Sequence, residues 1–394
     1  MADLFTKTED IGYGSRVGGS FVSALFGILL FVLAFPLHFW NEGRAVAEHK
    51  ALQEGATSVV DAPITPVNTA MEGKLIHVGG KATATQPVSD AQFGVTAQAL
   101  ALERKVEMFQ WREHKKTRTE KKLGGGERKI TEYTYDTGWD DDVIDSQKFE
   151  HPEDHTNPGK MPFSSTRIDA NPVHLGDLVL APSFANRIGN EEPLAPKVSD
   201  LPPNLGATFQ LDDGRLVTSK TPATPDVGDL RVQWSRVPEQ VLSVVGLQHA
   251  GVVESYTASN GREVALLESG EVSAKQMFAA AESRNNQLTW MLRVGGTFLM
   301  WLGMVMFLGP IARILDFLPF LGNLVEGGVM LVSALLAFCL SAITIAVAWF
   351  FYRPIVGIAM IAIAVGAALL LRKRAQRPPP PPLATMPPPP PPPR

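Results

Sequence analysis

Cysteine is almost absent from the sequence: Cys339 is the only one among 394 residues. Disulfide bonds within the chain are therefore excluded, and a folded domain must rely on an ordinary hydrophobic core. Asn-x-Ser/Thr glycosylation sites are also missing between residues 41 and 293. This absence favours a bacterial periplasm over a glycosylating lumen as the surroundings of that region.

Common catalytic signatures are missing as well, including G-x-S-x-G, H-E-x-x-H and C-x-x-C. His151, Asp154 and His155 have the residue types of a metal site. However, Pro152 and Pro158 disfavour the helix that would bring these side chains together, so we expect an exposed polar loop. The sequence predicts no catalytic, cofactor-binding or metal-binding residue, and hence a protein that is not an enzyme.

Charged residues are missing from long stretches at both ends of the chain. Residues 17–40 contain no Lys, Arg, Asp or Glu. About 24 helical residues extend roughly 36 Å, enough to cross a bilayer core of roughly 30 Å. Similar apolar runs within residues 292–315, 324–352 and 354–371 bring the prediction to four transmembrane helices. A cleaved signal peptide is the alternative for the first helix, and a re-entrant pair is the alternative for the second and third.

The number of spans and the positive charges together predict an orientation. An even number of spans places both termini on one side, and the basic cluster that begins at Arg372 assigns that side to the cytoplasm. Residues 1–16 and the tail, 372–394, are therefore expected in the cytoplasm. The fold class is an integral membrane protein with four α-helical spans and a large β-rich (α+β) extracytoplasmic domain, residues 41–291, between spans 1 and 2.

The extracytoplasmic domain is predicted to consist mainly of short strands. Residues 104–129 read as a long charged hairpin with a glycine tip, in preference to a phosphate-binding loop. A Pro-rich and Gly-rich connection divides the domain into two lobes near residues 196–204. Helical stems are expected near residues 44–53 and 275–291, where the domain joins its spans. An excess of acidic residues makes nucleic acid an unsuitable partner.

The tail contains two proline tracts and no residues that form a core. Such a segment adopts polyproline II structure. It serves either as a disordered spacer or as a ligand for a polyproline-recognising domain.

Polar and aromatic residues gather where the predicted spans end. Charges persist at such positions when they are paired or hydrated, and aromatic rings settle at the membrane interface. These residues are either boundary residues or the lining of a polar pocket between the spans. The candidates are Trp40, Asn41, Glu42, Arg44, Arg313, Asp316, Glu326, Tyr352 and Arg353.

Small residues recur at helical spacing in the first and fourth spans, where they permit close approach of helices within one chain or between copies. The alternative is a chance distribution in alanine-rich segments. The candidates for helix packing are Gly19, Ser23 and Gly27 in the first span, and Ala362, Ala364, Gly366 and Ala368 in the fourth.

Five segments, in this order, resemble the LUMA (transmembrane protein 43) family. They are FPLHFWNEGRAV (35–46), VEMFQWRE (106–113), HTNPGKMPF (155–163), ARILDFLPFLGNLVEGG (312–328) and AWFFYRP (348–354). The resemblance covers about residues 15–374, and the proline-rich tail departs from it. It implies a four-span protein whose large loop faces the lumen or periplasm. Eukaryotic members of the family lie in the endoplasmic reticulum and inner nuclear membrane, self-associate, and help to organise complexes with emerin and lamins.

These observations lead to two functional hypotheses. The first is a membrane scaffold that self-associates through its spans and assembles envelope protein or lipid complexes on its extracytoplasmic domain. The second is an intramembrane enzyme or lipid-handling protein that uses the polar pocket. The expected partners are membrane lipids, further copies of the chain and other envelope membrane proteins. The expected location is a bacterial inner membrane with the domain in the periplasm, or, in a eukaryote, the endoplasmic reticulum or inner nuclear membrane with the domain in the lumen.

Overall fold

The computed structural model describes residues 4–122, 124–315 and 319–355, together with positions 358, 359, 362, 363, 365, 366, 369 and 372. Half of the predicted fourth span, residues 354–371, lies outside the described residues. Asp316, Ala364, Ala368 and the tail after Arg372 also lie outside the described residues.

Three long helices contain the apolar stretches. They are α1 (Tyr13–Ser58), α4 (Ala274–Leu315) and α5 (Pro319–Tyr352). Each is long and apolar enough to cross a membrane. Since α1 and α4 run on well beyond their apolar parts, the helical stems predicted near residues 44–53 and 275–291 are confirmed.

The first of two large sheets carries the hairpin. Its strand order is β1 (Leu4–Ile11), β7 (Glu127–Asp140), β6 (Ala101–Lys121), β14 (Leu230–Val237), β13 (Arg215–Val217) and β12 (Gln210–Asp212), with β11 (Glu192–Leu194) also pairing β14 and β8 (Thr166–Asp169) pairing β6. The second sheet joins β19 (Leu266–Ser269), β15 (Val241–His249), β16 (Val252–Glu254), β10 (Leu178–Leu180), β9 (Val173–Leu175), β3 (Leu75–Ala84) and β2 (Val60–Asp61).

Smaller elements complete the domain. Two short ladders pair β4 (Val88–Asp90) with β5 (Val95–Ala97) and β17 (Tyr256–Thr257) with β18 (Glu263–Val264). The short helices are α2 (Pro182–Ala185) and α3 (Pro203–Gly206), and the 3-10 turns are η1 (Thr69–Met71), η2 (Ser146–Lys148) and η3 (Val198–Asp200).

The predicted division of the domain near residues 196–204 does not separate the two sheets. Strand β6 precedes this connection and β14 follows it, yet the two are paired over eight residues of the first sheet. In the second sheet β3 and β15 pair in the same way. Both halves of the sequence therefore build both sheets, because the strongest apolar strands of each half need a hydrogen-bonded neighbour from the other.

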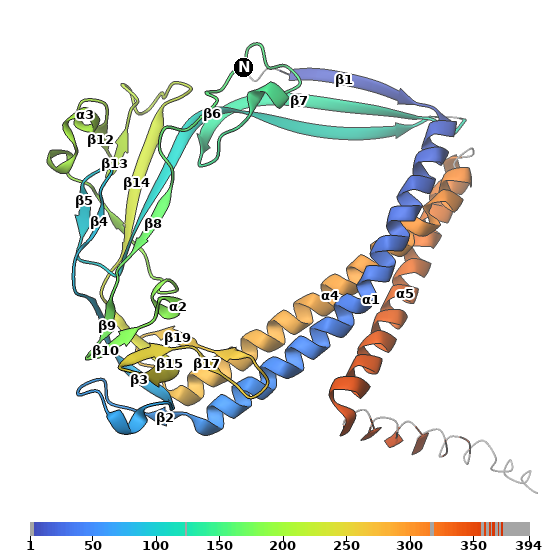
Figure 1. The fold of residues 1–394 in the computed structure, drawn as a ribbon. Helices are drawn as coiled ribbons and strands as arrows, with labels where there is room; N and C mark the ends of the chain where they lie inside the picture. The colour runs from blue at the N-terminus through green and yellow to red at the C-terminus, as the bar shows by residue number, and fades with distance from the viewer. Residues whose placement is uncertain are drawn as a thin grey trace, which may run out of the picture.

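The predicted charged hairpin is confirmed. Strands β6 and β7 pair from Met108 opposite Asp140 to Lys121 opposite Glu127. At the tip, Gly124 and Gly125 have φ angles of +85° and +81°, which residues with a Cβ atom rarely adopt. The sequence analysis missed β1, which adds a third strand to this hairpin. Figure 1 shows the three strands running from the domain to the N-terminal end of α1, so that strands and helices enclose a ring.

A buried ion pair joins the β4–β5 ladder to the first sheet. The Arg104 guanidinium donates to both carboxylate oxygens of Asp90, each at 2.8 Å, and the Trp234 indole donates to the same carboxylate at 3.1 Å. Asp90 and Arg104 are 2% and 4% exposed. Removing one partner would leave the other charge buried without compensation.

We expect Asp90→Ala to lower the free energy of unfolding of the β domain by about 3–5 kcal/mol, because Arg104 loses its counter-ion. Asp141→Ala, which removes a carboxylate from the exposed surface, is the matched control and should change little. Denaturant unfolding of the full chain followed by tryptophan fluorescence measures both. Equal stability of the two variants would contradict the importance of the pair.

Candidate functional site

The helices α1 and α4 approach each other most closely at two glycines. A Cβ atom on Gly27 would lie 2.6 Å from the Gly303 carbonyl oxygen, and one on Gly303 would lie 2.6 Å from the Phe31 backbone nitrogen. Neither position therefore accepts a larger residue without separating the helices. The small residue Gly27, predicted to support helix packing, is thus used inside the chain, against a partner that the sequence analysis did not select.

A buried ion pair lies where the apolar part of this helix pair meets the stems of the domain. Glu42 of α1 is 1% exposed and accepts two hydrogen bonds from the Arg293 guanidinium of α4, at 2.6 and 2.8 Å. The Trp349 indole of α5 donates a third hydrogen bond to Glu42 at 2.8 Å. The guanidinium also lies 4.8 Å from the centre of the Trp290 ring, within range of a cation–π contact. Glu42 therefore connects all three helices at one point.

The neighbours of Glu42 extend this connection along α4. The Asn41 side chain donates to the Thr289 carbonyl oxygen at 3.0 Å. Arg44 donates to Asn285 at 3.0 Å and to the Thr289 hydroxyl at 2.9 Å. These acceptors are uncharged. Where its apolar part ends, α1 is thus attached to α4 by a continuous set of polar contacts.

The remaining residues of the stretch have separate roles. Gly43 lies against the Tyr352 ring, since a Cβ there would be 2.7 Å from the Tyr352 Cζ atom. His38 is fully buried, with its Nε2 atom 3.1 Å from the Ser341 hydroxyl. Trp40 is 57% exposed and borders a shallow pocket with Thr344 and Tyr352 of α5. We call Asn41, Glu42, Arg44, Arg293 and Trp349, with the residues that they bind, the polar corner.

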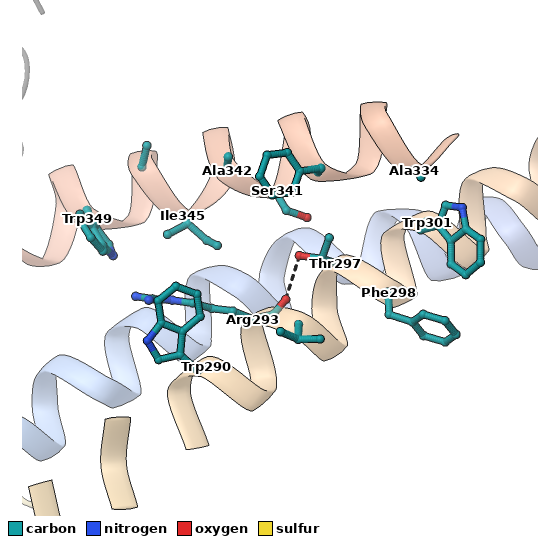
Figure 2. A pocket seen from close by; sticks show the side chains of 13 residues that line it. Trp290, Arg293, Thr297, Phe298, Trp301, Ala334, Ser341, Ala342, Ile345 and Trp349 are labelled. Carbon is teal, nitrogen blue, oxygen red and sulfur yellow. Dashed lines mark hydrogen bonds between the residues drawn. The ribbon is translucent and has the colours of Figure 1, made fainter. Parts of the chain in front are cut away.

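An apolar groove lies beside the polar corner, between α4 and α5. Its volume is about 680 Å³. Figure 2 shows Trp290, Arg293 and Trp349 at one end and Phe298 and Trp301 towards the other. Between Trp349 and Ala334 the α5 wall of the groove is about 22 Å long, at 1.5 Å per residue. This is longer than one leaflet, which is about half of a hydrocarbon core of about 30 Å. The groove therefore has the length and polarity that suit a hydrocarbon chain.

A second polar cluster lies at the opposite end of the helices. The buried Arg16 side chain pairs with Glu127 at the start of β7, and Arg313 of α4 lies 3.4 Å from the same carboxylate. Lys121 of β6 pairs with Glu326 of α5 at 3.1 Å. We call these residues the tip cluster. All of them except Lys121 border a cavity of about 570 Å³.

The predicted polar residues are thus divided between the two clusters. Asn41, Glu42 and Arg44 belong to the polar corner, and Tyr352 packs against its Gly43. Arg313 and Glu326 belong to the tip cluster. Arg353 is exposed and Trp40 lies on the outer surface. Arg293 reaches Glu42 from the first turn of the apolar part of α4.

Sequence reasoning also missed the partners on α4 and on the hairpin. Arg293 is a lone charge at the start of an apolar run, and such a charge needs a counter-ion. Glu42 lies at the end of another apolar run, so the pairing of these two residues could have been predicted from the sequence. The pairing of Arg16 with Glu127 joins residues 111 positions apart and left no local signal.

The histidines considered for a metal site have packing roles. The segment is a loop in which Asp154 is exposed, as expected, but the His155 ring is 1% exposed and stacks on Tyr135 at 3.8 Å. His151 stacks on Phe5 at 4.0 Å. Among the described residues, no group of three His, Cys, Asp or Glu side chains is placed to hold a metal ion.

Comparison with known proteins gives consistent matches. A family model described as transmembrane protein 43 matches residues 108–354. Human transmembrane protein 43 is 32% identical over 365 residues, covering 88% of this chain and 89% of the human protein. The rat protein is 31% identical over 350 residues, covering 86% and 85%, and a Drosophila melanogaster homolog is 28% identical over 349 residues, covering 86% and 91%. No solved structure matches.

These relatives are all from animals, so the expectation of a bacterial member, with the domain in a periplasm, has no support from them. The eukaryotic alternative is consistent with the comparisons.

We expect Glu42→Gln to destabilise the helix bundle by about 3–5 kcal/mol, because it leaves the buried Arg293 charge without its counter-ion. The double variant Glu42→Leu with Arg293→Met removes both charges and should recover most of the loss, since apolar pairs often replace buried ion pairs without cost. Thermal unfolding of the purified full chain in detergent compares the two. A single variant as stable as the wild type, or a double variant less stable than the single one, would contradict this role.

Proposed function

The chain belongs to the transmembrane protein 43 family, and we propose that it is a membrane organiser that self-associates and assembles envelope protein or lipid complexes on its β-rich domain. Family membership and three apolar helices make it an integral membrane protein with a large β-rich domain. The names of these relatives state no reaction.

The observation that supports an organising role is the continuity between membrane and domain. Helices α1 and α4 run without interruption from their apolar parts into the domain, where Leu52, Met277 and Phe278 join one buried core. The polar corner fixes the two helices to each other at the point where the apolar part ends. A domain attached in this way keeps one orientation relative to the membrane, as a platform for assembly requires.

Self-association has one suitable face on α1. The predicted packing residues Gly19 and Ser23 line the cavity that α1 forms with α4 and α5, and α4 covers Gly27, so all three face the bundle. Gly14 and Gly18 lie one turn apart outside this cavity, are exposed, and have no heavy atom within 4 Å of the position of a Cβ. They leave a smooth surface to which a second copy can pack closely.

A lipid-handling role is the second candidate, and the groove between α4 and α5 favours it. Carbon atoms make up almost all of the groove's surface. The groove opens on the outer side of α4 and α5, where large apolar side chains are exposed. A lipid chain is the occupant that matches this surface. The four-span topology, with the large domain outside the cytoplasm, stays a prediction.

We expect native mass spectrometry of the full chain, extracted with its membrane and without detergent, to show more than one copy per particle. Gly18→Leu should shift the particles towards monomers, because the larger side chain prevents close helix approach. Gly19→Leu is the matched control: it changes the neighbouring residue, which also has room for a side chain but faces the cavity inside the bundle. A monomeric wild type, or equal effects of the two variants, would contradict self-association through this face.

We expect Ala342→Trp to reduce the lipid that remains bound to each copy, because the indole fills the groove between α4 and α5. Leu335→Trp adds the same ring on the exposed side of α5, outside the groove, and should leave the bound lipid unchanged. Lipid adducts counted by native mass spectrometry give the result. Equal lipid retention in both variants would contradict binding in the groove.

A further inference from the structure

The groove between α4 and α5 has two unlike walls. On the α4 side it is bordered by the rings of Trp290, Phe298 and Trp301. On the α5 side the lining includes Ala342 and Ala346, which lie one turn apart and carry no atom beyond Cβ. Figure 2 shows the rings spaced along α4 and the small residues along α5. A flat ligand can therefore lie against the alanines on one face and meet aromatic rings on the other.

The two hydroxyl groups in the middle of the groove are already used inside the bundle. The Thr297 hydroxyl donates to the Arg293 carbonyl oxygen of its own helix at 2.8 Å. The Ser341 hydroxyl donates to the Met300 sulfur at 3.6 Å and lies 3.1 Å from the His38 Nε2 atom. A ligand in the middle of the groove is therefore held by apolar contact, and its polar group must lie at an end.

Arg293 is the charged residue at the polar end of the groove. Of the described residues that line the groove, it alone carries a charge. Its Nε and Nη2 atoms donate to the Glu42 carboxylate at 2.6 and 2.8 Å. The guanidinium also lies 4.8 and 5.5 Å from the ring centres of Trp290 and Trp349. Its Nη1 atom makes no hydrogen bond to a residue that the structure describes, so this nitrogen can donate to a ligand.

The ion pair determines which head group this end accepts. A phosphate bound to Arg293 would lie close to the Glu42 carboxylate, which is 1% exposed. The two like charges would repel each other, and displacement of Glu42 would leave a buried carboxylate without its counter-ion. An uncharged hydroxyl can instead accept one hydrogen bond from Nη1 and leave the ion pair intact. The site therefore favours a lipid with a neutral hydroxyl head.

The rest of the groove favours a rigid body over a flexible chain. An acyl chain loses conformational freedom when it is confined, whereas a fused ring system has little to lose. Aromatic side chains also offer large apolar contact areas to such rings. The α5 wall, about 22 Å long at 1.5 Å per residue, has room for a ring system with a short hydrocarbon tail.

The sequence of α4 supplies an independent indication. Arg293, Phe298 and Leu302 follow, in reverse order and with Phe in place of Tyr, a short pattern proposed for cholesterol contact. Such a pattern is weak evidence by itself. Here it coincides with the groove, because Arg293 and Phe298 both line it.

We propose that the groove holds a sterol-type lipid, whose flat rings lie between α4 and α5 and whose single hydroxyl accepts a hydrogen bond from Arg293. This inference rests on the lipid-handling role proposed above for the same groove, and it adds the class of lipid. The hydroxyl then lies beside the polar corner, and the rings extend from there along the apolar parts of the two helices.

Photolabelling of the full chain in phosphatidylcholine vesicles tests the site. We expect a cholesterol analogue with a photoactivatable group on its rings to label residues within 290–301 or 334–349. Ala346→Phe fills the groove and should abolish this labelling. Val347→Phe places the same ring on the next residue, which is 57% exposed and outside the groove, and should retain it. Labelling elsewhere on the chain, or equal labelling of the two variants, would overturn the proposed site.

Competition with unlabelled sterols tests the head group. Cholesterol and cholesterol sulfate share one ring system, but the sulfate places a negative charge beside Glu42. We expect cholesterol sulfate to need at least about a ten-fold higher concentration than cholesterol to prevent labelling, because like charges repel at this end. Equal competition by the two sterols would overturn recognition of a neutral hydroxyl.

A photoactivatable phosphatidylcholine separates this inference from the role on which it rests. If this phospholipid labels the groove and the sterol does not, the sterol assignment fails while the lipid-handling role stands. If neither probe labels the groove, both fail. Labelling by the sterol that an excess of phosphatidylcholine leaves unchanged supports both.

Discussion

The attachment of α1 to α4 fixes how the β domain is held against the apolar helices. Gly27 and Gly303 bring the two backbones together inside the apolar region, and Glu42 with Arg293 fixes their register where that region ends. Each contact alone would leave some freedom, because a glycine crossing resists separation but not sliding, while a salt bridge resists sliding only if its partners remain close. Together they make the helix pair a rigid base, and the domain inherits its orientation from it.

Rigidity of this kind gives meaning to the most distinctive stretch of the sequence. In FPLHFWNEGRAV, Asn41, Glu42 and Arg44 each bind α4, whereas Gly43 gives room to Tyr352 of α5. Such a dense set of contacts in four residues is a structural requirement. Family resemblance in this stretch therefore reports a shared helix junction, and it is weak evidence for a shared catalytic chemistry.

The sequence predicted those features that depend on local pattern and missed those that depend on distant partners. Residues 17–40 show their helical, membrane-suited character in composition alone, and the hairpin shows itself through alternation and the glycine tip. By contrast, β1 has a short charged sequence with no apolar alternation, and it forms only because β7 offers an open edge. The Glu42 and Arg293 pairing was within reach, since isolated charges beside apolar runs must be compensated. The interleaving of the two sheets was not, because strand order is set by the packing of the whole domain.

Hydropathy states that a segment prefers hydrocarbon, but it does not state the direction in which the segment lies there. Residues 17–40 satisfy the length for a span. The positive-inside rule has no force on the N-terminal segment, where Asp10 and Glu9 offset the nearby bases. In the structure both ends of the apolar part of α1 are held by the β domain, one through a buried core and the other through the paired strand β1. These contacts depend on residues far away in the sequence, so the composition of residues 17–40 does not reveal them.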